Sequence, residues 1–363
     1  MISSRTTAVI VLTWMLGLPL WSHASNISAN DAFRAIRKIT TSEGIEHQDI
    51  VTIGGVPQWI SIRARDRNAP ILLVLHGGPG FTVSPVSDYY MRDWEEFFTV
   101  VQWDQRGAGK SHQSDGKQAL APTLTIDRLV RDTEELIELL RKRFKRDRVV
   151  LMAHSFGTIL GVKVAQRRPD LLYAYVGMGQ FVDAMRSEAL GYEATLADAR
   201  AAKNAEAIAA LEAIAPFPDA ARPERNLQNL AIERRWLAHY GGYFRAGGLG
   251  QHHAVEQLSP TYTAADLQAR QEAHDFIVQT MWKELANVNL NDAVQFRVPI
   301  IIMQGRHDRG TSSELVEEWH GAVKAPYKKL IWFEDSSHMV YEEEPGKLLV
   351  ALATEVLPLT RPK

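Results

Sequence analysis

Val149-Val-Leu-Met-Ala-His-Ser155-Phe-Gly157 is the stretch from which the fold of this chain can be derived. The apolar residues before the serine predict a buried strand, and the residues 158–167 after it predict a helix. A strand, a sharp turn and a helix with a hydroxyl at the apex form a nucleophile elbow. In an elbow the serine stands clear of the sheet, and the next backbone N–H can face a developing oxyanion. A serine between small residues is also typical of turns and helix caps, so the hypothesis needs a base, an acid and an oxyanion hole elsewhere.

Continuous apolar runs recur along the chain and predict strands that are buried on both faces. These runs are 71–75, 99–103, 149–152, 172–178, 299–303 and 329–333. A helix over 29–39 and a hairpin of two strands, 49–53 and 58–63, are expected before them, and helical patterns lie between them, most clearly over 124–144. Strands that alternate with helices predict an α/β fold, with a mostly parallel central sheet and helices on both faces.

The interval 180–293 breaks this alternation because it has no strand pattern. It holds helical stretches over 187–215 and 227–240 and a glycine-dense loop with aromatic residues over 240–250. We therefore predict an all-helical cap (lid) inserted between two strands of the core. The expected domains are a signal peptide over 1–24, the first part of the core over 25–179, the cap over 180–293 and the second part of the core over 294–363.

The composition is that of an ordinary globular protein. The chain has 363 residues, of which 45% are hydrophobic and 23% charged, and its formal net charge is -2. Near-neutral charge gives no electrostatic argument for binding nucleic acid or an anionic membrane. The basic cluster 141–148 lies at the end of a helical pattern, where positive charge complements the helix dipole. The lack of cysteine excludes disulfides, thiol catalysis and thiolate metal sites.

The first 24 residues have the pattern of a secretory signal peptide. Arg5 supplies a positive charge, residues 8–20 form an apolar region, and Ser22-His-Ala24 resembles a small-x-small cleavage site. We expect cleavage after Ala24 and a mature chain that begins near Ser25. The apolar run is shorter than the roughly 20 residues that span a bilayer, so cleavage is favoured over an uncleaved anchor. No later segment is apolar enough for stable membrane insertion, and the pattern predicts export to a bacterial periplasm or to the medium.

A glycine-rich turn follows the first buried run, at the edge where ligands sit in parallel sheets. His76-Gly-Gly-Pro-Gly80 comes directly after 71–75, and its glycines leave backbone N–H groups unshielded. We predict that the N–H of Gly78 pairs with the N–H of Phe156 to form the oxyanion hole. In isolation this motif would be a plain turn, but its position upstream of Ser155 favours the functional interpretation.

An acid and a histidine follow the last two predicted strands. Gln304-Gly-Arg-His-Asp308 comes after 299–303, and Glu334-Asp-Ser-Ser-His338 comes after 329–333. The order Ser155, Asp308, His338 is the one expected for a catalytic triad on an α/β-hydrolase sheet. We predict that His338 removes the Ser155 proton and later gives it to the leaving group, while Asp308 orients the imidazole. Asp335 is the nearest rival to Asp308, but it lies on the same loop as the histidine and is expected to be solvated.

Two further motifs do not indicate a cofactor or a metal. Gly109-Lys-Ser111 suggests a phosphate loop, but Asp104 stands where that loop requires a glycine. We expect Asp104 and Arg106 to make hydrogen bonds beside the site instead. His252-His253 has no acidic or histidine partner at metal-ligand spacing, which predicts a pair of loop histidines. The sequence therefore predicts no metal and no cofactor.

Taken together, the quoted motifs resemble those of proline iminopeptidase-like (prolyl aminopeptidase) α/β-hydrolases. The resemblance rests on 76–80, 104–111, the Ser155 elbow, 305–308 and His338, and it covers roughly 45–180 and 295–360. It implies a serine hydrolase with a helical cap that releases an N-terminal residue, often proline, from small amides or peptides. By the matching motif positions, the triad would be Ser155, Asp308 and His338, and the oxyanion donors Gly78 and Phe156.

The chain departs from this family at two places. Ala153 replaces the usual first glycine of the elbow, and an added methyl group there is compatible with activity. Members of the family bind the free α-amine with cap glutamates, commonly near a Trp-x-x-Trp-Glu motif, which Met281-Trp-Lys-Glu284 only partly resembles. Glu188 is the first candidate for this role, followed by Glu233 and Glu284.

Other functions therefore remain open. The same triad suits an esterase, lactonase or amidase without a free-amine requirement, and a non-catalytic ligand receptor on a hydrolase scaffold is a remote alternative. A carboxylate at the elbow, as epoxide hydrolases and dehalogenases need, is absent, because Ser155 occupies that position. The expected partner is a small-molecule or short-peptide substrate, and the sequence predicts no oligomeric state.

Overall fold

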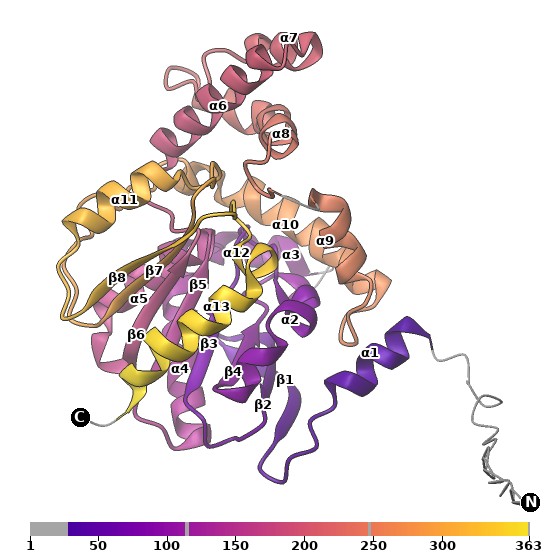
Figure 1. Cartoon of the computed structure of the whole chain (residues 1–363), viewed down its shortest axis with the longest axis vertical. Coiled ribbons are helices and arrows are strands. Elements are labelled where there is room, and N and C mark those ends of the chain that lie inside the picture. The colour runs from indigo at the N-terminus through magenta and orange to yellow at the C-terminus, as the bar shows by residue number, and fades with distance from the viewer. Residues whose placement is uncertain (1–27, 113–115, 246–247, 362–363) are drawn as a thin grey trace, which may run out of the picture.

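The computed structural model describes residues 28–112, 116–245 and 248–361, and the strands of these residues form one eight-stranded sheet (Figure 1). Its order is β1-β2-β4-β3-β5-β6-β7-β8. The hairpin β1–β2 and the pair β2–β4 are antiparallel, and every other pair of neighbours is parallel. The strands are β1 (Ile45–Ile53), β2 (Val56–Ala64), β3 (Ile71–Leu75), β4 (Thr99–Trp103), β5 (Val149–His154), β6 (Leu172–Met178), β7 (Ile300–Gly305) and β8 (Lys328–Phe333).

Helices cover both faces of this sheet. Those of the core are α1 (Ala29–Arg37), α2 (Ser84–Tyr90), α3 (Lys117–Leu120), α4 (Ile126–Phe144), α5 (Phe156–Arg167), α11 (Ser313–Ala322), α12 (Val340–Glu343) and α13 (Pro345–Ala351). Shorter helical segments are Arg92–Glu96, Gly109–Ser111, Ala121–Thr123, Pro169–Leu171, Leu352–Val356 and Leu357–Thr360.

Successive residues of the central strands point alternately into two separate hydrophobic layers, as the two-residue period of a strand requires. On β3, Leu73 and Leu75 pack in the layer that contains residues of α4, α5 and α11. Leu72 and Val74 face the other way, into the layer that contains residues of α2, α12 and α13. Both faces of the sheet are therefore buried. This explains why the sequences of the central strands are apolar throughout rather than alternately apolar and polar.

The helix α4 begins and ends at recognisable caps. The Thr125 hydroxyl accepts a hydrogen bond from the Arg128 N–H at 3.1 Å, so the helix begins at Ile126, two residues after the predicted start at Leu124. Lys145 ends it in the left-handed conformation with φ 52°. Arg141, Lys142 and Arg143 lie in the last turn, which agrees with the interpretation of the basic cluster as a helix end.

Five helices and no strand lie between β6 and β7 in the described part of this interval. They are α6 (Ala184–Ala201), α7 (Ala205–Ala213), α8 (Pro223–His239), α9 (Gly248–Glu256) and α10 (Ala264–Leu285). The helices α6, α7 and α8 stand clear of the sheet at the top of Figure 1 and have a small hydrophobic cluster of their own, which includes Tyr192, Leu211 and Trp236. These three helices thus share a hydrophobic cluster apart from the sheet, whereas Ile277 and Met281 of α10 belong to a cluster of the sheet.

Two sequence predictions in this segment need correction. The single helical stretch over 187–215 is two helices, because Lys203 adopts φ 54° and Asn204 then caps α7 through its side chain. The loop predicted over 240–250 ends earlier than expected, since α9 begins at Gly248. His252 and His253 therefore lie on a helix, not in a loop.

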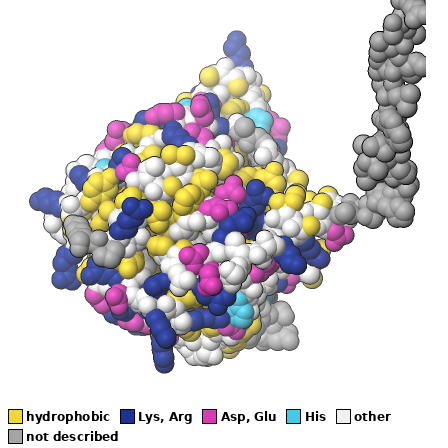
Figure 2. All heavy atoms as spheres, turned by 60° about the horizontal axis from the view of Figure 1, so that its bottom comes forward, with side chains coloured by type: hydrophobic (Ala, Val, Ile, Leu, Met, Phe, Trp, Pro, Cys, Tyr) yellow, Lys and Arg dark blue, Asp and Glu magenta, His cyan; other side chains and the backbone are white. Residues whose placement is uncertain are grey.

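The surface carries both signs of charge. On the face shown in Figure 2, lysine and arginine side chains are interspersed with aspartate and glutamate rather than gathered in one patch. None of the helices in the described residues is long and apolar enough to cross a membrane.

Candidate active site

Ser155 lies at a sharp turn between β5 and α5. Its backbone has φ 54° and ψ -125°, a conformation that residues with a side chain rarely adopt. The Ser155 N–H donates to the Met178 carbonyl at 2.9 Å, which ties the turn to the end of the neighbouring strand. The side chain is partly exposed although its chain neighbours are buried. The local geometry is thus that of the predicted elbow.

Two glycines allow this turn to approach the β3 loop closely. A Cβ on Gly157 would lie 2.7 Å from the His76 carbonyl oxygen, and one on Gly77 would lie 2.8 Å from the Ser155 Cβ. No side chain fits at either position without movement of the elbow. Ala153 lies within β5 and is fully buried, so its methyl group packs in the core and leaves the turn free.

His338 and Asp308 meet at the carboxyl ends of the last two strands. His338 Nδ1 lies 2.8 Å from Asp308 Oδ2, and both side chains are almost completely buried. The Gln304 amide and the Thr311 hydroxyl also donate to Asp308 Oδ2, at 2.9 and 2.7 Å. Asp335 is exposed on the same loop as His338, as expected.

The surroundings of Asp308 keep its carboxylate ionised. Burial by itself raises the pKa of this group. The His338 ring and the hydrogen bonds from His338 and Thr311 outweigh the effect of burial, so the pKa of Asp308 is lower than its ordinary value. A buried anion beside Nδ1 leaves the other nitrogen, Nε2, available to accept a proton.

Ser155 and His338 line the same cavity, and His154 joins their two loops. His154 Nε2 lies 3.0 Å from the His338 carbonyl oxygen, and the two rings are 4.7 Å apart between centroids. Burial lowers the pKa of His154 to about 3, so the ring is neutral and Nε2–H can donate to that carbonyl. The residue directly before Ser155 thus fixes the backbone of the loop that carries His338.

The two predicted oxyanion donors also line this cavity. Phe156 is the first residue of α5, where backbone N–H groups have no acceptor within the helix. Gly78 adopts φ 109°, which a residue with a side chain would rarely adopt. The turn that carries Gly78 is held by His76, whose Nδ1 lies 2.9 Å from the Gly77 carbonyl oxygen and whose Nε2 accepts the Gln105 N–H at 3.1 Å.

The three candidate glutamates have different surroundings. Glu188 lines the cavity, where the Arg234 guanidinium donates to both of its carboxylate oxygens. Glu233 is fully buried behind the lining and also pairs with Arg234, while burial and the charge of Glu188 raise its pKa. Glu284 is not in the cavity, because its carboxylate accepts the Ile126 N–H at 3.0 Å and thereby caps α4. We therefore discard Glu284 as a substrate-binding candidate.

The cavity has a volume of about 390 Å³, and its wall is predominantly apolar. Glu188 and Arg234 are the only Asp, Glu, Lys or Arg residues of the lining within the described chain. Arg234 packs over the Tyr243 ring, 5.9 Å from its centroid, and the Tyr243 ring in turn lies 5.4 Å from the His338 ring. One aromatic ring thus separates the charged pair from the histidine.

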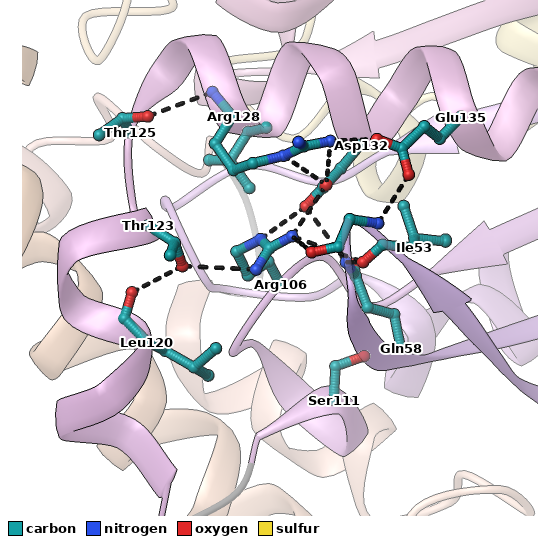
Figure 3. Close-up of polar contacts among 12 residues, drawn as sticks. Ile53, Gln58, Arg106, Ser111, Leu120, Thr123, Thr125, Arg128, Asp132 and Glu135 are labelled. Atoms are coloured by element: carbon teal, nitrogen blue, oxygen red, sulfur yellow. Dashed lines mark hydrogen bonds and ion pairs between the residues drawn. The ribbon is translucent and has the colours of Figure 1, made fainter.

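The loop after β4 also makes contacts in the core, besides the contact of Gln105 with His76. Arg106 donates to both carboxylate oxygens of Asp132 on α4, at 2.7 and 3.0 Å, and to the Gly54 carbonyl in the β1–β2 turn at 3.0 Å (Figure 3). Asp104 is fully buried and accepts from the Ser84 and Tyr262 hydroxyls and from the Lys110 N–H. These hydrogen bonds were expected, but those of Arg106 lead away from Ser155.

The described residues hold no group of three or more His, Asp or Glu side chains arranged to bind a metal ion. His252 is buried between two carboxylates, with Nδ1 2.7 Å from Glu342 and Nε2 2.8 Å from Glu256. The expectation that His252 has no acidic partner at metal-ligand spacing was wrong, since Glu256 lies one helical turn away.

Four residues of the site were not predicted: His76, His154, Arg234 and Tyr243. His76 and His154 lie inside motifs that the sequence analysis used, so their positions were available but their hydrogen bonds were not. Tyr243 belongs to the glycine-dense loop. Arg234 had no signal, because its partner Glu188 is 46 residues away in the chain.

Comparisons with known proteins agree with this geometry. A family model described as the alpha/beta hydrolase family matches residues 71–352. A probable aminopeptidase of Bacillus subtilis (strain 168) is 28% identical over 298 residues, which cover 82% of this chain and 92% of that protein. A proline iminopeptidase of Arabidopsis thaliana is 34% identical over 111 residues, which cover 31% of this chain and 27% of that protein.

Solved structures share the fold. A proline iminopeptidase from Mycobacterium smegmatis superposes with a TM-score of 0.62 at 21% identity, over 86% of this chain and 99% of that one. A proline iminopeptidase-related protein from Thermus thermophilus gives a TM-score of 0.63 at 22% identity, over 87% of this chain and 99% of that one. These likenesses confirm the predicted fold class.

Proposed function

The chain belongs to the alpha/beta hydrolase family, and from this membership we propose that it is a serine hydrolase of the proline iminopeptidase type. It cleaves the N-terminal residue from small amides or peptides through an acyl-enzyme. The observation that carries the proposal is the hydrogen-bonded pair His338–Asp308, 2.8 Å apart, in the same cavity as the strained Ser155. The relative from Bacillus subtilis, matched over most of both chains, is named as a probable aminopeptidase.

The proposed mechanism assigns one role to each residue of the site. Ser155 Oγ attacks the carbonyl carbon of the substrate while His338 Nε2 takes the hydroxyl proton. The oxyanion that forms accepts hydrogen bonds from the N–H groups of Gly78 and Phe156. The imidazolium is stabilised by Asp308 and then gives its proton to the leaving amine. Water repeats the sequence on the acyl-enzyme and releases the acid.

The charges around Arg234 support a free-amine requirement. Above the raised pKa of Glu233, which is about 7, Glu188 and Glu233 together carry two negative charges, and Arg234 supplies one positive charge. The ammonium group of a peptide N-terminus at Glu188 would neutralise the remaining charge. We keep Glu188 as the residue in contact with the amine and assign Glu233 to a supporting position behind Arg234.

The experiment compares three substrates of the purified enzyme. Proline naphthylamide should be hydrolysed, its N-acetylated form should not, and Ser155→Ala should lose the activity. Cleavage of only the acetylated amide or of short p-nitrophenyl esters would exclude the aminopeptidase function.

A second candidate, an esterase, lactonase or amidase with the same triad, has a specific observation in its favour. The Arg234 guanidinium already occupies both carboxylate oxygens of Glu188. If this pair persists with substrate bound, no carboxylate is left for an amine, and the cavity selects its ligand by apolar contact alone. The same three substrates distinguish the two candidates.

We also propose that helices α6 to α10 act as the lid and that the protein is exported to the periplasm or secreted. The lid is supported by residues from α6, α8 and α10 that line the cavity, such as Met185, Leu230 and Trp282. Export is supported by the signal-peptide pattern of residues 1–24, which lie outside the described residues. The N-terminal sequence of the protein recovered from the periplasm or medium tests it, and the expected first residue is Ser25.

A further inference from the structure

The cavity is larger than a prolyl group requires. Its volume of about 390 Å³ lies within the range of pockets that enclose whole drug-sized ligands. At roughly 30 Å³ for each water molecule it has room for about a dozen of them. The pyrrolidine ring of a prolyl residue has five atoms. A small N-terminal residue would therefore leave much of the wall in contact with water.

The wall of this space is predominantly apolar, although Asn226, Tyr243 and Thr311 also line it. Leu230 lies one helical turn before Arg234 on α8, so both side chains lie on the same face of that helix. Phe217 contributes from the segment after α7, Phe181 from the segment after β6, and Trp282 from α10. These side chains come from four separate segments and line the same cavity as Phe156.

The only charged side chains in the described lining lie together at one place. If the substrate amine is held at Glu188, the side chain of the same residue must lie among the apolar groups next to it. A large apolar side chain would displace water from this wall, and burial of apolar surface is the main source of binding energy in such pockets.

We infer that this enzyme prefers substrates whose N-terminal residue has a large apolar side chain, such as phenylalanine or leucine, over proline or alanine. The inference rests on the proposed function for the place of the amine. The preference for a large apolar side chain rests on the size and the lining of the cavity. Leu230 is accordingly a specificity-determining residue, because it stands next to the arginine that pairs with Glu188.

The test measures kcat/KM for the alanine, proline, leucine and phenylalanine naphthylamides. The leaving group is the same in all four, so the ratios report on the N-terminal residue alone. We expect the phenylalanine and leucine substrates to exceed the alanine and proline substrates by at least about 10-fold, as apolar pockets discriminate. Preference for proline over both large residues would overturn the inference.

A cavity-filling variant tests the position of the side chain. Leu230→Trp should lower the ratio of phenylalanine to alanine turnover by about 10-fold or more. Ile232→Trp is the matched control, because Ile232 lies on the same helix with 37% of its surface exposed and outside the cavity. A ratio does not depend on the fraction of folded enzyme, so a loss of stability in either variant does not affect the result. An unchanged ratio in Leu230→Trp would overturn the assignment.

A different experimental result is expected if the proposed function is wrong. In that case none of the four naphthylamides is hydrolysed, whereas p-nitrophenyl esters are. The esters then test the cavity directly, since octanoyl should be preferred over acetyl by about 10-fold or more. Preference for acetyl would overturn the inference in this form as well.

Discussion

Ser155 combines a reactive hydroxyl with a backbone conformation that costs stability. A residue with a side chain at φ 54° and ψ -125° is held there by the surrounding structure, at a cost of about 1–3 kcal/mol. Glycine would adopt the same conformation without this cost. At this position activity requires serine, whereas stability would be higher with glycine.

Two substitutions at Ser155 test this separation. Ser155→Ala and Ser155→Gly should both lower kcat by several orders of magnitude, about 10⁶-fold in well-studied triads, because neither has a nucleophile. Ser155→Gly should be more stable than Ser155→Ala by about 1 kcal/mol, since only glycine relieves the backbone. Urea unfolding of the two variants gives this difference. Equal stabilities would mean that the turn is not strained.

Asp308 can be tested against Asp335, the other acid considered in the sequence analysis. Asp308→Asn removes the negative charge from the group that orients His338 Nδ1, and kcat should fall by about 10⁴-fold. Asp335→Asn is the matched control, because Asp335 is exposed on the same loop as His338, and its activity should stay within about two-fold. Steady-state kinetics on one substrate are sufficient. Equal losses in the two variants would contradict the assignment of Asp308.

These residues could be selected from the sequence for a physical reason. Ser155, Asp308 and His338 each follow a continuous apolar run, and buried parallel strands deliver their next residues to one edge of the sheet. Arg234 could not be selected, because its meaning depends on a partner on another helix. The same holds for Glu284, whose motif resembled a binding site while its carboxylate caps α4.

Among the secondary-structure elements, a chain of alternating charges connects α9 and α10 to α12 and to the loop after β3. Glu342 on α12, His252 and Glu256 on α9 and Arg270 on α10 form successive contacts. Arg270 also donates to the Thr82 carbonyl at 2.8 Å, close to the turn that carries Gly78. All four side chains are at most 4% exposed, so these ion pairs are little screened by solvent.

His252 makes this connection dependent on pH. Burial lowers the pKa of His252, but contacts with Glu256 and Glu342 outweigh burial and raise the pKa to about 9. A raised pKa means that its stabilising effect is fully present below the ordinary value of 6.5 and is lost as pH rises through about 9. The effect is on the order of 3 kcal/mol.

Thermal unfolding between pH 6 and pH 10 measures this effect. The Tm of the parent protein should fall by several degrees over this range, and most steeply above pH 8. His252→Gln should have a lower Tm at pH 7 and a flatter pH dependence, because its side chain does not titrate. His253→Gln is the matched control, since His253 also contacts Glu256 but its side chain is 57% exposed, so solvent screens this contact. A Tm profile of His252→Gln parallel to that of the parent would contradict the role of this histidine.

Helices and strands could be predicted from the sequence where their signal lies in neighbouring residues. The strand 172–178 was predicted with the observed bounds, since apolar runs and their boundaries are local features. The α9 helix was missed because Gly248 and Gly250 suggested a loop, whereas the contacts of His252 with Glu256 and Glu342 stabilise a helix there. One ion pair within the helix and one with the distant Glu342 thus overrode the local propensity.

For the whole molecule, the first helix connects the N-terminal segment to the core. Arg37 is buried at the end of α1, and its guanidinium lies 2.7 Å from Asp88 and 2.8 Å from Glu95. Glu95 also binds Arg63 at 2.9 Å, and Arg63 donates to the Arg37 carbonyl at 2.6 Å. The helix is thus bound to α2 and to β2 by charges that are inaccessible to solvent.

This arrangement predicts where the chain can be shortened. Removal of residues 1–24, the proposed signal peptide, leaves α1 and its ion pairs in place, so a chain that begins at Ser25 should unfold at the Tm of the full-length protein. A chain that begins at Thr40 lacks α1, so Asp88 and Glu95 lose the Arg37 cation and become accessible to water on that side. Loss of one partner of a buried ion pair costs at most about 3–5 kcal/mol, and access of water lowers this cost, which predicts a Tm lower by roughly 5–10 °C.

Point variants separate the ion pairs from the rest of the helix. Arg37→Ala should account for most of the loss, and Arg34→Ala, exposed on the same helix, should stay within about 0.5 kcal/mol of the parent. Urea unfolding of both variants in the chain that begins at Ser25 gives the comparison. If Arg37→Ala were as stable as Arg34→Ala, α1 would be held by the contact of Phe33 with Tyr89 rather than by charge. The expected order follows from burial. Removal of the exposed Arg34 leaves no buried charge without its cation, whereas removal of Arg37 takes a cation from the buried carboxylates of Asp88 and Glu95.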